Sequence, residues 1–490
     1  MKKVFMSMIL FYCIGVMAQE SQYELMKKTL NEKSLPLVNV MVDTAVVHQT
    51  GYVSGEIEIA DFLRRTDPKE ETVRFQCKYR IRGGASSRYV KKSFAIKLYD
   101  EFGEDLDANI FGIRAENSWI LDAMAIDRTR MRNRVCFDVW NEMSHTPYDT
   151  KYENRNGTMG VFVEVFINGD YHGLYCMTDK IDRKLLGLKK IKMKDDGEVS
   201  VRGVLYKGVS WNGYTDIWLR SYSNADTSKD TWNGWELQYP GDEPSDNTWQ
   251  PLMDLIDFCS DSTPDDVFRQ EYQNYFYTEN LVDYAVFTMA LHVGDNAYKN
   301  TFLSVVDISK GHRYLISPWD MDQSLGGYWN GDYNETTASI NRYAHVAPFN
   351  RLAVKNMDGF RDMEASKWAE CYTTLFSCES IARRLDHYAE LFTSSGAWER
   401  EYEKWNGNPV PLKECITDEL EYVKDWYKKN YESLCTQFGI DVPTGIISKA
   451  SYSPSTNSIF TLDGRKMDEK AILRKGVYIV NGKKVVVLSP

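Results

Sequence analysis

The chain lacks the motifs that mark several common classes of enzyme and binding protein. Its 9 cysteines form no CxxC pattern and no HExxH sequence occurs, so the residues give no sign of a zinc site. A GxSxG nucleophile turn and a Walker phosphate loop are also missing. Acidic residues outnumber basic ones by 70 to 59, a net charge of −11, which argues against a nucleic-acid-binding surface. The remaining composition, 43% hydrophobic and 26% charged over 490 residues, predicts a globular protein of two lobes or two to three domains.

No apolar run after the N-terminus is long enough to span a bilayer, and the N-terminal run itself is too short. The stretch MKKVFMSMILFYCIGVMAQE combines a basic start, an apolar middle and small residues, which predicts a secretory signal peptide cut after Ala18. Cleavage removes one cysteine and leaves an even number, which suits an oxidising compartment without requiring disulfides. We therefore expect a soluble protein without a transmembrane segment that is secreted or lies at the cell surface or in the periplasm.

Apolar periodicity divides the chain into a β-rich N-terminal part and a mainly helical C-terminal part, which predicts an α+β fold. Alternating residues over 36–100 predict strands, and the stretch IDRTRMRNRVCFDVWNEM predicts a helix capped by Asp127. A tight hairpin turn is predicted at Asn168-Gly169, because this pair adopts positive φ angles readily. The predicted segments are a signal peptide at 1–18, a main domain at 19–440 with an N-lobe at about 36–185, an aromatic-rich irregular insertion at about 208–245 and a C-lobe at about 246–440, a linker rich in Pro, Ser and Gly at 441–455, and a small β module at 456–490.

Two acidic motifs follow apolar segments in the C-terminal half. The stretch HVGDNAYKN places Asp295 five residues before Asn300, the spacing of the catalytic loop of protein kinases. In that loop the acid orients or deprotonates the acceptor hydroxyl and the amide holds a metal. Farther on, PWDMDQ places Asp320 and Asp322 on one side of an extended chain. Because neighbouring carboxylates repel each other, this pair indicates a cation between them.

A glycine-rich turn and a lysine-bearing strand lie near the N-terminus. IRGGASSR offers Gly83, Gly84, Ser86, Ser87 and Arg88 for close approach to phosphates, with Lys91 and Lys92 adding positive charge. In SFAIKLY, Ala95 and Lys97 share one strand face, as in the V-A-I-K strand of protein kinases. Each piece alone is common in strands and loops without such a role. The order of the pieces is what favours a nucleotide site.

These stretches together resemble the CotH kinase family, the spore-coat type of atypical protein kinase and its secreted bacterial relatives. The matching sequences are RGGASSRYVKKSFAIKL, RMRN, VFINGDYHGLYCMTDKID, GDNAYKN and ISPWDMDQSLG, within about 36–435. The resemblance implies a bilobal kinase-like fold, ATP with Mg²⁺ (or Mn²⁺), and phosphoryl transfer to Ser/Thr hydroxyls of a protein substrate. The family's Glu-Lys-Ile-Asp motif, between the lobes, reads Asp179-Lys180-Ile181-Asp182 here. The tail after 455 resembles the C-terminal sorting modules of secreted Bacteroidetes proteins.

The resemblance implies a role for each motif. Asp295 and Lys97 are the candidate catalytic residues, with Glu142 as a candidate partner for Lys97. Asn300, Asp320 and Asp322 are the candidate metal ligands. The candidate nucleotide-binding residues are Gly83, Gly84, Ser86, Ser87, Arg88, Lys92, Lys97, Asp179 and Lys180.

Two alternatives stay open at this point. A pseudokinase or surface scaffold would keep the fold and bind a partner, such as a glycan, through the aromatic insertion, although packing is the simpler role of those aromatics. A nucleotidyl transferase on the same fold would need the same metal and triphosphate.

Overall fold

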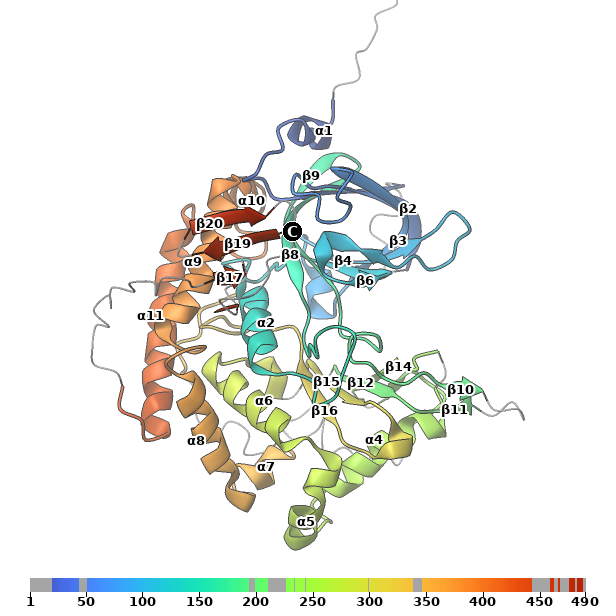
Figure 1. Cartoon of the computed structure of the whole chain (residues 1–490), viewed down its shortest axis with the longest axis vertical. Coiled ribbons are helices and arrows are strands. Elements are labelled where there is room, and N and C mark those ends of the chain that lie inside the picture. Colours follow the sequence, from blue (N-terminus) through green and yellow to red (C-terminus); the bar gives the residue numbers. More distant parts are fainter. Residues whose placement is uncertain are drawn as a thin grey trace, which may run out of the picture. The chain divides into compact units, whose positions relative to one another are not determined.

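The computed structural model describes residues 20–43, 51–193, 199–209, 226–232, 234–242, 244–297, 299–337 and 346–442, together with the strands 459–461, 466–467, 476–480 and 483–487. The chain divides into two compact units, Met1–Ile440 and Asp441–Pro490. The larger unit combines a barrel, a second sheet and a set of helices (Figure 1). The α+β class predicted from the sequence is confirmed.

Seven strands of the larger unit close into a barrel in the order β1-β2-β3-β4-β7-β9-β8. They are β1 (Leu37–Val42), β2 (Val53–Ala60), β3 (Thr72–Arg82), β4 (Ser93–Tyr99), β7 (Ser118–Asp122), β8 (Gly160–Ile167) and β9 (Asp170–Thr178). Neighbouring strands are antiparallel except β1 and β8, which pair in parallel with Leu37 opposite Glu164. Alternate side chains, such as Phe94, Ile96 and Leu98 of β4, fill the interior, as expected for a small barrel.

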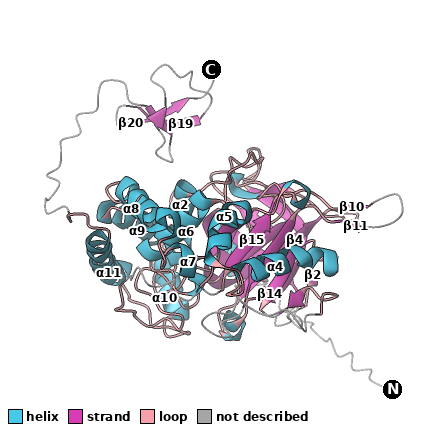
Figure 2. Cartoon of the chain, turned by 90° about the horizontal axis from the view of Figure 1, so that it is seen from below, coloured by secondary structure: helices cyan, strands magenta, loops and turns pink. Residues whose placement is uncertain are grey.

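The second sheet has the order β13-β14-β12-β15-β16 and lies beside the helices (Figures 1 and 2). Its strands are β12 (Val204–Gly208), β13 (Thr231–Trp232), β14 (Trp235–Tyr239), β15 (Thr301–Val305) and β16 (Leu315–Pro318). The helices after β14 are α4 (Asp246–Cys259), α5 (Asp265–Tyr275), α6 (Thr278–Ala290), α7 (Phe349–Leu352), α8 (Phe360–Cys371), α9 (Cys378–Ser394), α10 (Ala397–Trp405) and α11 (Ile416–Gln437). Smaller elements are α1 (Gln22–Lys27) and the pairs β5 (Ala108–Asn109) with β6 (Ala115–Glu116) and β10 (Lys192–Met193) with β11 (Val199–Ser200).

Helix α2 (Arg132–Met143) follows the barrel strand β7 and begins five residues after Asp127. The carboxylate of Asp127 accepts hydrogen bonds from the backbone N–H groups of Thr129 at 2.8 Å and Arg132 at 2.7 Å. It therefore satisfies a free donor at the first turn, as the sequence predicts, although from farther upstream than an ordinary cap. This contact fixes the start of a helix that carries Asn133 toward the site described below.

The structure corrects two predicted elements. The stretch LYCMTDKIDRKLL predicts a strand that runs into a helix, but residues 183–187 form turns after β9, because the Asp182 carboxylate accepts a hydrogen bond from the backbone N–H of Leu185 at 2.8 Å and Gly187 takes a φ of 63°. The insertion predicted as irregular contributes β13 and β14 to the second sheet, with Lys207 opposite Glu236. The rest of its aromatic core, 210–225, lies outside the described residues. The predicted hairpin turn at Asn168-Gly169 is confirmed by φ angles of 53° and 86°.

The smaller unit contains one antiparallel sheet in the order β18-β17-β19-β20. Its strands are β17 (Ile459–Thr461), β18 (Lys466–Met467), β19 (Gly476–Val480) and β20 (Lys483–Val487). The turns predicted at Asp463-Gly464 and Asn481-Gly482 and the predicted signal peptide lie outside the described residues. Among the described residues, no helix has the length and apolarity that crossing a membrane requires.

Candidate active site

The cleft of the larger unit consists of two cavities that share one wall. Apolar residues of barrel strands, such as Ala95 and Ile120, line part of the first cavity, of about 440 Å³, which is named the apolar cavity after them; polar side chains such as Arg80, Lys180 and Gln238 line the rest. The second, of about 290 Å³, is lined by acidic residues of the C-terminal half. Both are lined by Arg82, Gly83, Gly84, Lys207, Glu236 and Trp319. The shared wall means that a single elongated ligand can reach from the apolar cavity to the acidic one.

The acidic cavity brings together the two motifs predicted from the sequence. Asp295 begins a short 3-10 helix after α6, Asn300 precedes β15, and Asp320 follows β16. The Asn300 amide donates to Asp295 at 3.2 Å and to Asp320 at 3.4 Å. Asn300 and Asp320 take φ angles of 55° and 57°, so the backbone is left-handed just before β15 and just after β16. Asp322 lines the same cavity, so all four predicted residues converge.

Backbone contacts hold the two motif segments against each other. Gly294 donates its N–H to the Gln323 carbonyl at 3.0 Å, and a β carbon at position 294 would lie 2.2 Å from the Gln323 side chain. The Asn296 side chain donates to the carbonyls of Asn300 at 2.7 Å and Trp319 at 3.0 Å. A glycine and an asparagine around Asp295 thus fix its position relative to the 320–322 segment.

Asp122 is a cavity residue that the sequence analysis did not identify. It ends β7, lines the acidic cavity, and accepts a hydrogen bond from the Asn133 amide at 3.1 Å. Burial and the nearby Asp320 raise its pKa. Its position at the end of the apolar strand SWILD is the only signal that pointed to it.

Asn133 connects Asp122 with the acidic 320–322 segment. While its amide nitrogen donates to Asp122, its oxygen accepts a hydrogen bond from the backbone N–H of Met321 at 3.1 Å. The RMRN stretch of α2 therefore supports the turn on which Asp320 and Asp322 lie.

Asp322 and Asp295 have different surroundings in the same cavity. Asp295 forms an ion pair with Lys299 at 2.8 Å. The Asp322 carboxylate makes no hydrogen bond or ion pair with any residue that the structure describes, and its pKa is raised well above the ordinary value by burial, Asp320 and Asp122. A carboxylate in that situation is stabilised by a cation, and the donors around it are the oxygens that Mg²⁺ prefers.

The oxygen atoms of Asp320, Asp322 and Asn300 fit a divalent ion whose remaining ligands are water and phosphate oxygens. In the described part of the chain, no three His, Cys, Asp or Glu side chains lie close enough to hold a metal by themselves. Mg²⁺ commonly keeps water and phosphate oxygens and takes only one or two protein carboxylates. Asp322 or Asp320 with the Asn300 amide would satisfy that requirement.

The predicted glycine-rich turn lines the cleft. Gly83 takes a φ of 108°, and a β carbon there would lie 2.1 Å from the Ser86 hydroxyl, so the turn depends on glycine. Ser86 lines the acidic cavity and Ser87 the apolar one. Lys92 is directed to the turn itself, donating to the Ser87 carbonyl at 2.7 Å. Arg88 is exposed and does not line either cavity.

Lys97 does not line the cavities, although its charge acts on the predicted residue Lys180. Ala95 lines the apolar cavity, but Lys97, two residues along the same face of β4, lies over the Tyr52 ring at 5.2 Å and lines neither cavity. Glu142 is not its partner, because Glu142 pairs with Arg384 at 2.7 Å. Lys91 is fully buried and pairs with Glu401 of α10 at 2.6 Å.

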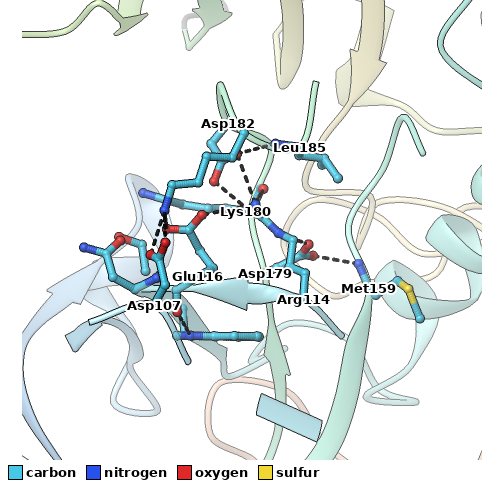
Figure 3. A network of polar contacts seen from close by, with 12 residues as sticks. Asp107, Arg114, Glu116, Met159, Asp179, Lys180, Asp182 and Leu185 are labelled. Carbon is cyan, nitrogen blue, oxygen red and sulfur yellow. Dashed lines mark hydrogen bonds and ion pairs between the residues drawn. The ribbon is translucent and has the colours of Figure 1, made fainter. Parts of the chain in front are cut away.

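Asp179 and Asp182 belong to a network of polar contacts, while Lys180 and Ile181 between them line the apolar cavity (Figure 3). Arg114 donates to Asp179 and to Asp182, each at 2.7 Å, and Arg155 donates to Asp179 at 2.9 Å. Asp179 is fully buried, so its contacts are structural. Lys180 lines the apolar cavity, and burial lowers its pKa.

Two cations that the sequence analysis missed occupy the wall shared by both cavities. Arg82 ends β3, and Lys207 lies in β12. Each lies 5.6 Å from the centre of the Trp319 ring. Arg82 directly precedes the Gly-Gly pair, which is a local signal, whereas nothing in the sequence around Lys207 marks it.

The CotH kinase protein model matches residues 79–434, from β3 to α11. The chain belongs to the CotH kinase family. The match contains every residue of the glycine turn and the acidic cavity described above. A search of curated proteins finds no match to the chain. Membership of the CotH kinase family implies an atypical protein kinase and, in general, use of ATP with a divalent metal.

Proposed function

We propose that this CotH-family protein transfers the γ-phosphate of ATP to Ser/Thr hydroxyls of a protein substrate. The observation that carries the proposal is the convergence of Asp295, Asn300, Asp320 and Asp322 on a cavity that shares a wall with an apolar one. The barrel and the helical part would then be the two lobes of a kinase-like fold. In this proposal the first cavity, with Ala95, Ile120 and Gln238, accommodates the nucleoside, and the acidic cavity accommodates the reacting end of the triphosphate.

The residues divide the chemistry between them. Asp295, held in place by Lys299 and Asn300, orients the acceptor hydroxyl and takes its proton. Asp320 or Asp322 with Asn300 would hold Mg²⁺ or Mn²⁺, which supplies charge neutralisation at the transferred phosphoryl group. The turn at 83–87 approaches the phosphates through backbone rather than side chains. Catalysis on this plan is mainly positioning and electrostatic stabilisation.

Incubation with ATP labelled at either the α or the γ position, with Mg²⁺ or Mn²⁺, tests the proposal. Label from γ-ATP in protein, stable to hydroxylamine and recovered as phosphoserine or phosphothreonine, supports it. Label from α-ATP instead would identify a nucleotidyl transferase. Absence of both labels, with ATP still bound, would identify a pseudokinase.

We also propose that the enzyme acts outside the cytoplasm. Support comes from the basic and apolar character of residues 1–18 and their predicted cleavage after Ala18. N-terminal sequencing of the protein recovered from intact cells, beginning at Gln19, is the expected result. A mature chain that retains Met1 would contradict it.

A further inference from the structure

The wall shared by the two cavities carries two positive charges from different parts of the fold. Arg82 ends a barrel strand, and Lys207 belongs to the second sheet. Both approach the ring of Trp319, which follows β16. Both line the apolar and the acidic cavity. The indole is thus the common contact of two cations at the junction between the cavities.

Neither cation forms an ion pair with a carboxylate of the described residues, although Asp122 lies near Arg82, and Glu236 and Asp320 lie near Lys207. No ion pair or hydrogen bond to a described residue satisfies Arg82 or Lys207, whereas the buried Lys91 and Arg114 each contact a carboxylate within 2.7 Å. Glu236 lies opposite Lys207 in the strand register, yet the two side chains form no ion pair. Burial and the nearby Arg82 lower the pKa of Lys207, and Glu236 and Asp320 offset this only in part.

We propose that Arg82 and Lys207 clamp the polyphosphate chain of the nucleotide, one cation from each side of the cleft, with Trp319 setting their positions. The inference rests on the proposed function and names the residues that bind its phosphates. A ligand with at least two adjacent negative charges would contact both cations at once. A planar guanidinium grips two phosphate oxygens, and an ammonium group adds a point charge.

The location favours a nucleoside polyphosphate over an acidic peptide. On one side of the clamp lies the cavity in which Ala95 and Ile120 offer apolar contacts and Gln238 offers hydrogen bonds, a combination that suits a nucleoside. On the other lies the acidic cavity with Asp322, which repels a carboxylate unless a metal accompanies it. A nucleoside triphosphate with its metal fits both cavities beside the clamp. Its polyphosphate chain, which lies between the nucleoside and the metal, would then lie at Arg82 and Lys207.

Calorimetric titration of Arg82→Gln, Lys207→Gln and the double variant with ATP, ADP, AMP and adenosine tests the clamp. Each single variant should lose at least about tenfold in ATP affinity, as expected for a charge-assisted contact. Adenosine affinity should stay unchanged, and the loss should shrink from ATP to AMP. Without nucleotide, the melting temperature should stay level or rise, because a like-charge repulsion is relieved.

Two further variants sharpen the test. Lys78→Gln is the matched control. Lys78 lies four residues before Arg82 on the same strand and, like Arg82, lies over an aromatic ring, that of Tyr99 at 4.3 Å, but it lines neither cavity. Its ATP affinity should equal that of the unaltered protein. Glu236→Gln removes the carboxylate opposite Lys207 and should strengthen ATP binding.

The outcomes separate the clamp from the proposed function. If the unaltered protein binds ATP and transfers phosphate while both Gln variants keep its ATP affinity within twofold, the clamp is wrong and the function stands. Equal losses for ATP and adenosine together with a lower melting temperature would assign Arg82 and Lys207 a structural role. Failure of the unaltered protein to bind any nucleotide would overturn the clamp and the function together.

Discussion

Asp295 and Asp322 line the same cavity but differ in their neighbours. Asp295 is paired with Lys299, whereas no described residue pairs with Asp322. Asp295→Ala should therefore bind ATP with Mg²⁺ normally and transfer phosphate about 10²- to 10⁴-fold more slowly, because proton acceptance matters in the transition state. Asp322→Ala, like Asp320→Ala, should lose the metal-dependent part of the ATP affinity. Titrations with and without Mg²⁺, beside single-turnover rates, measure both effects.

The division of roles fails on specific results. Equal losses of ATP affinity in all three variants would show that the carboxylates act as one group. An undiminished transfer rate in Asp295→Ala would remove Asp295 from the chemistry.

Lys97 gives a second prediction at the residue scale. The sequence predicts that it contacts phosphates, but the side chain lies over Tyr52 and outside the lining of both cavities. Lys97 therefore acts on the cavity only as a nearby charge, through Tyr52 and Lys180, and Lys97→Met should change the ATP affinity by no more than about threefold because solvent and salt screen that charge. The melting temperature should change little. A tenfold loss of ATP affinity at unchanged stability would restore the role predicted from the sequence.

Local motifs identified four residues of the acidic cavity. Other residues could not be identified from the sequence, because only the pairing of distant strands brings them to the cavity. Asp295 and Asn300 are close in sequence, and Asp320 and Asp322 lie at a strand end, so spacing alone indicated their chemistry. Asp122 and Lys207 join them only because β7 and β12 lie where the barrel and second sheet place them. The stretch around Lys97 matches the lysine-bearing strand of kinases in pattern. In the structure, however, Ala95 and Ile96 of β4 line the cavity and Lys97 does not.

At the scale of the element, α2 supports the metal segment through Asn133. Its amide bridges Asp122 and the backbone of Met321. Asn133→Ala should raise the Mg²⁺ concentration needed for half-maximal transfer by about tenfold or more, in the range found for residues that orient metal ligands. The ATP affinity without metal should stay the same. Asn141→Ala is the control on the same helix, because Asn141 donates to the Thr158 carbonyl instead. A uniform fall in stability without a change in metal requirement would contradict this.

Helix α8 contains a buried acid that predicts a pH dependence of stability. Burial raises the pKa of Glu364 from 4.5 to about 7. The folded protein then holds a proton that the unfolded chain releases, so stability is full below pH 4.5 and is lost as the pH rises through 7. Glu364→Gln should remove that loss and gain up to about 3 kcal/mol over the unaltered protein between pH 5 and pH 8. Urea unfolding across this range measures the gain.

The exposed Glu370 of the same helix supplies the control for that experiment. Its side chain is 71% exposed, so Glu370→Gln should leave the pH dependence of unfolding as it is. Parallel pH profiles for the Glu364→Gln variant and the unaltered protein would contradict the assignment.

Element boundaries were predictable where one local signal dominated. The barrel strands alternate clearly, and Asn168-Gly169 specifies its own turn. The segment after β9 has a helical apolar pattern, but the Asp182 cap, the Arg114 network and Gly187 hold it as turns. Strands β13 and β14 lie in a stretch of Trp, Asn and Gly with weak alternation, and their pairing with β12 decides their conformation.

At the scale of the whole molecule, the chemistry is confined to one compact unit. Every cavity residue described above precedes position 330, and the second unit begins at Asp441. Deleting residues 441–490 should therefore leave the phosphoryl-transfer rate and the ATP affinity unchanged while altering export or surface retention. A folded truncated protein that transfers no phosphate would show that the second unit takes part in the chemistry.

Closure of the barrel was not predictable from the sequence. Strand propensity gives the segments, but the order β1-β2-β3-β4-β7-β9-β8 depends on pairings between distant residues. The helices of the C-terminal half, by contrast, follow from the local periodicity of apolar residues, so the sequence predicts them more completely than it predicts the barrel.

The parallel pairing of β1 with β8 has a consequence for how the chain acquires its structure. Leu37 finds its partner Glu164 only after nearly the whole N-terminal part has been made, and until then β1 keeps one unpaired edge. Long-range pairing of this kind slows folding, and an open strand edge invites pairing with other chains. The candidate site, whose glycine turn and Asp122 both follow barrel strands, is complete only after β8 and β9 have closed the barrel. Activity during refolding should therefore appear with the slowest phase and not with the earlier formation of helices.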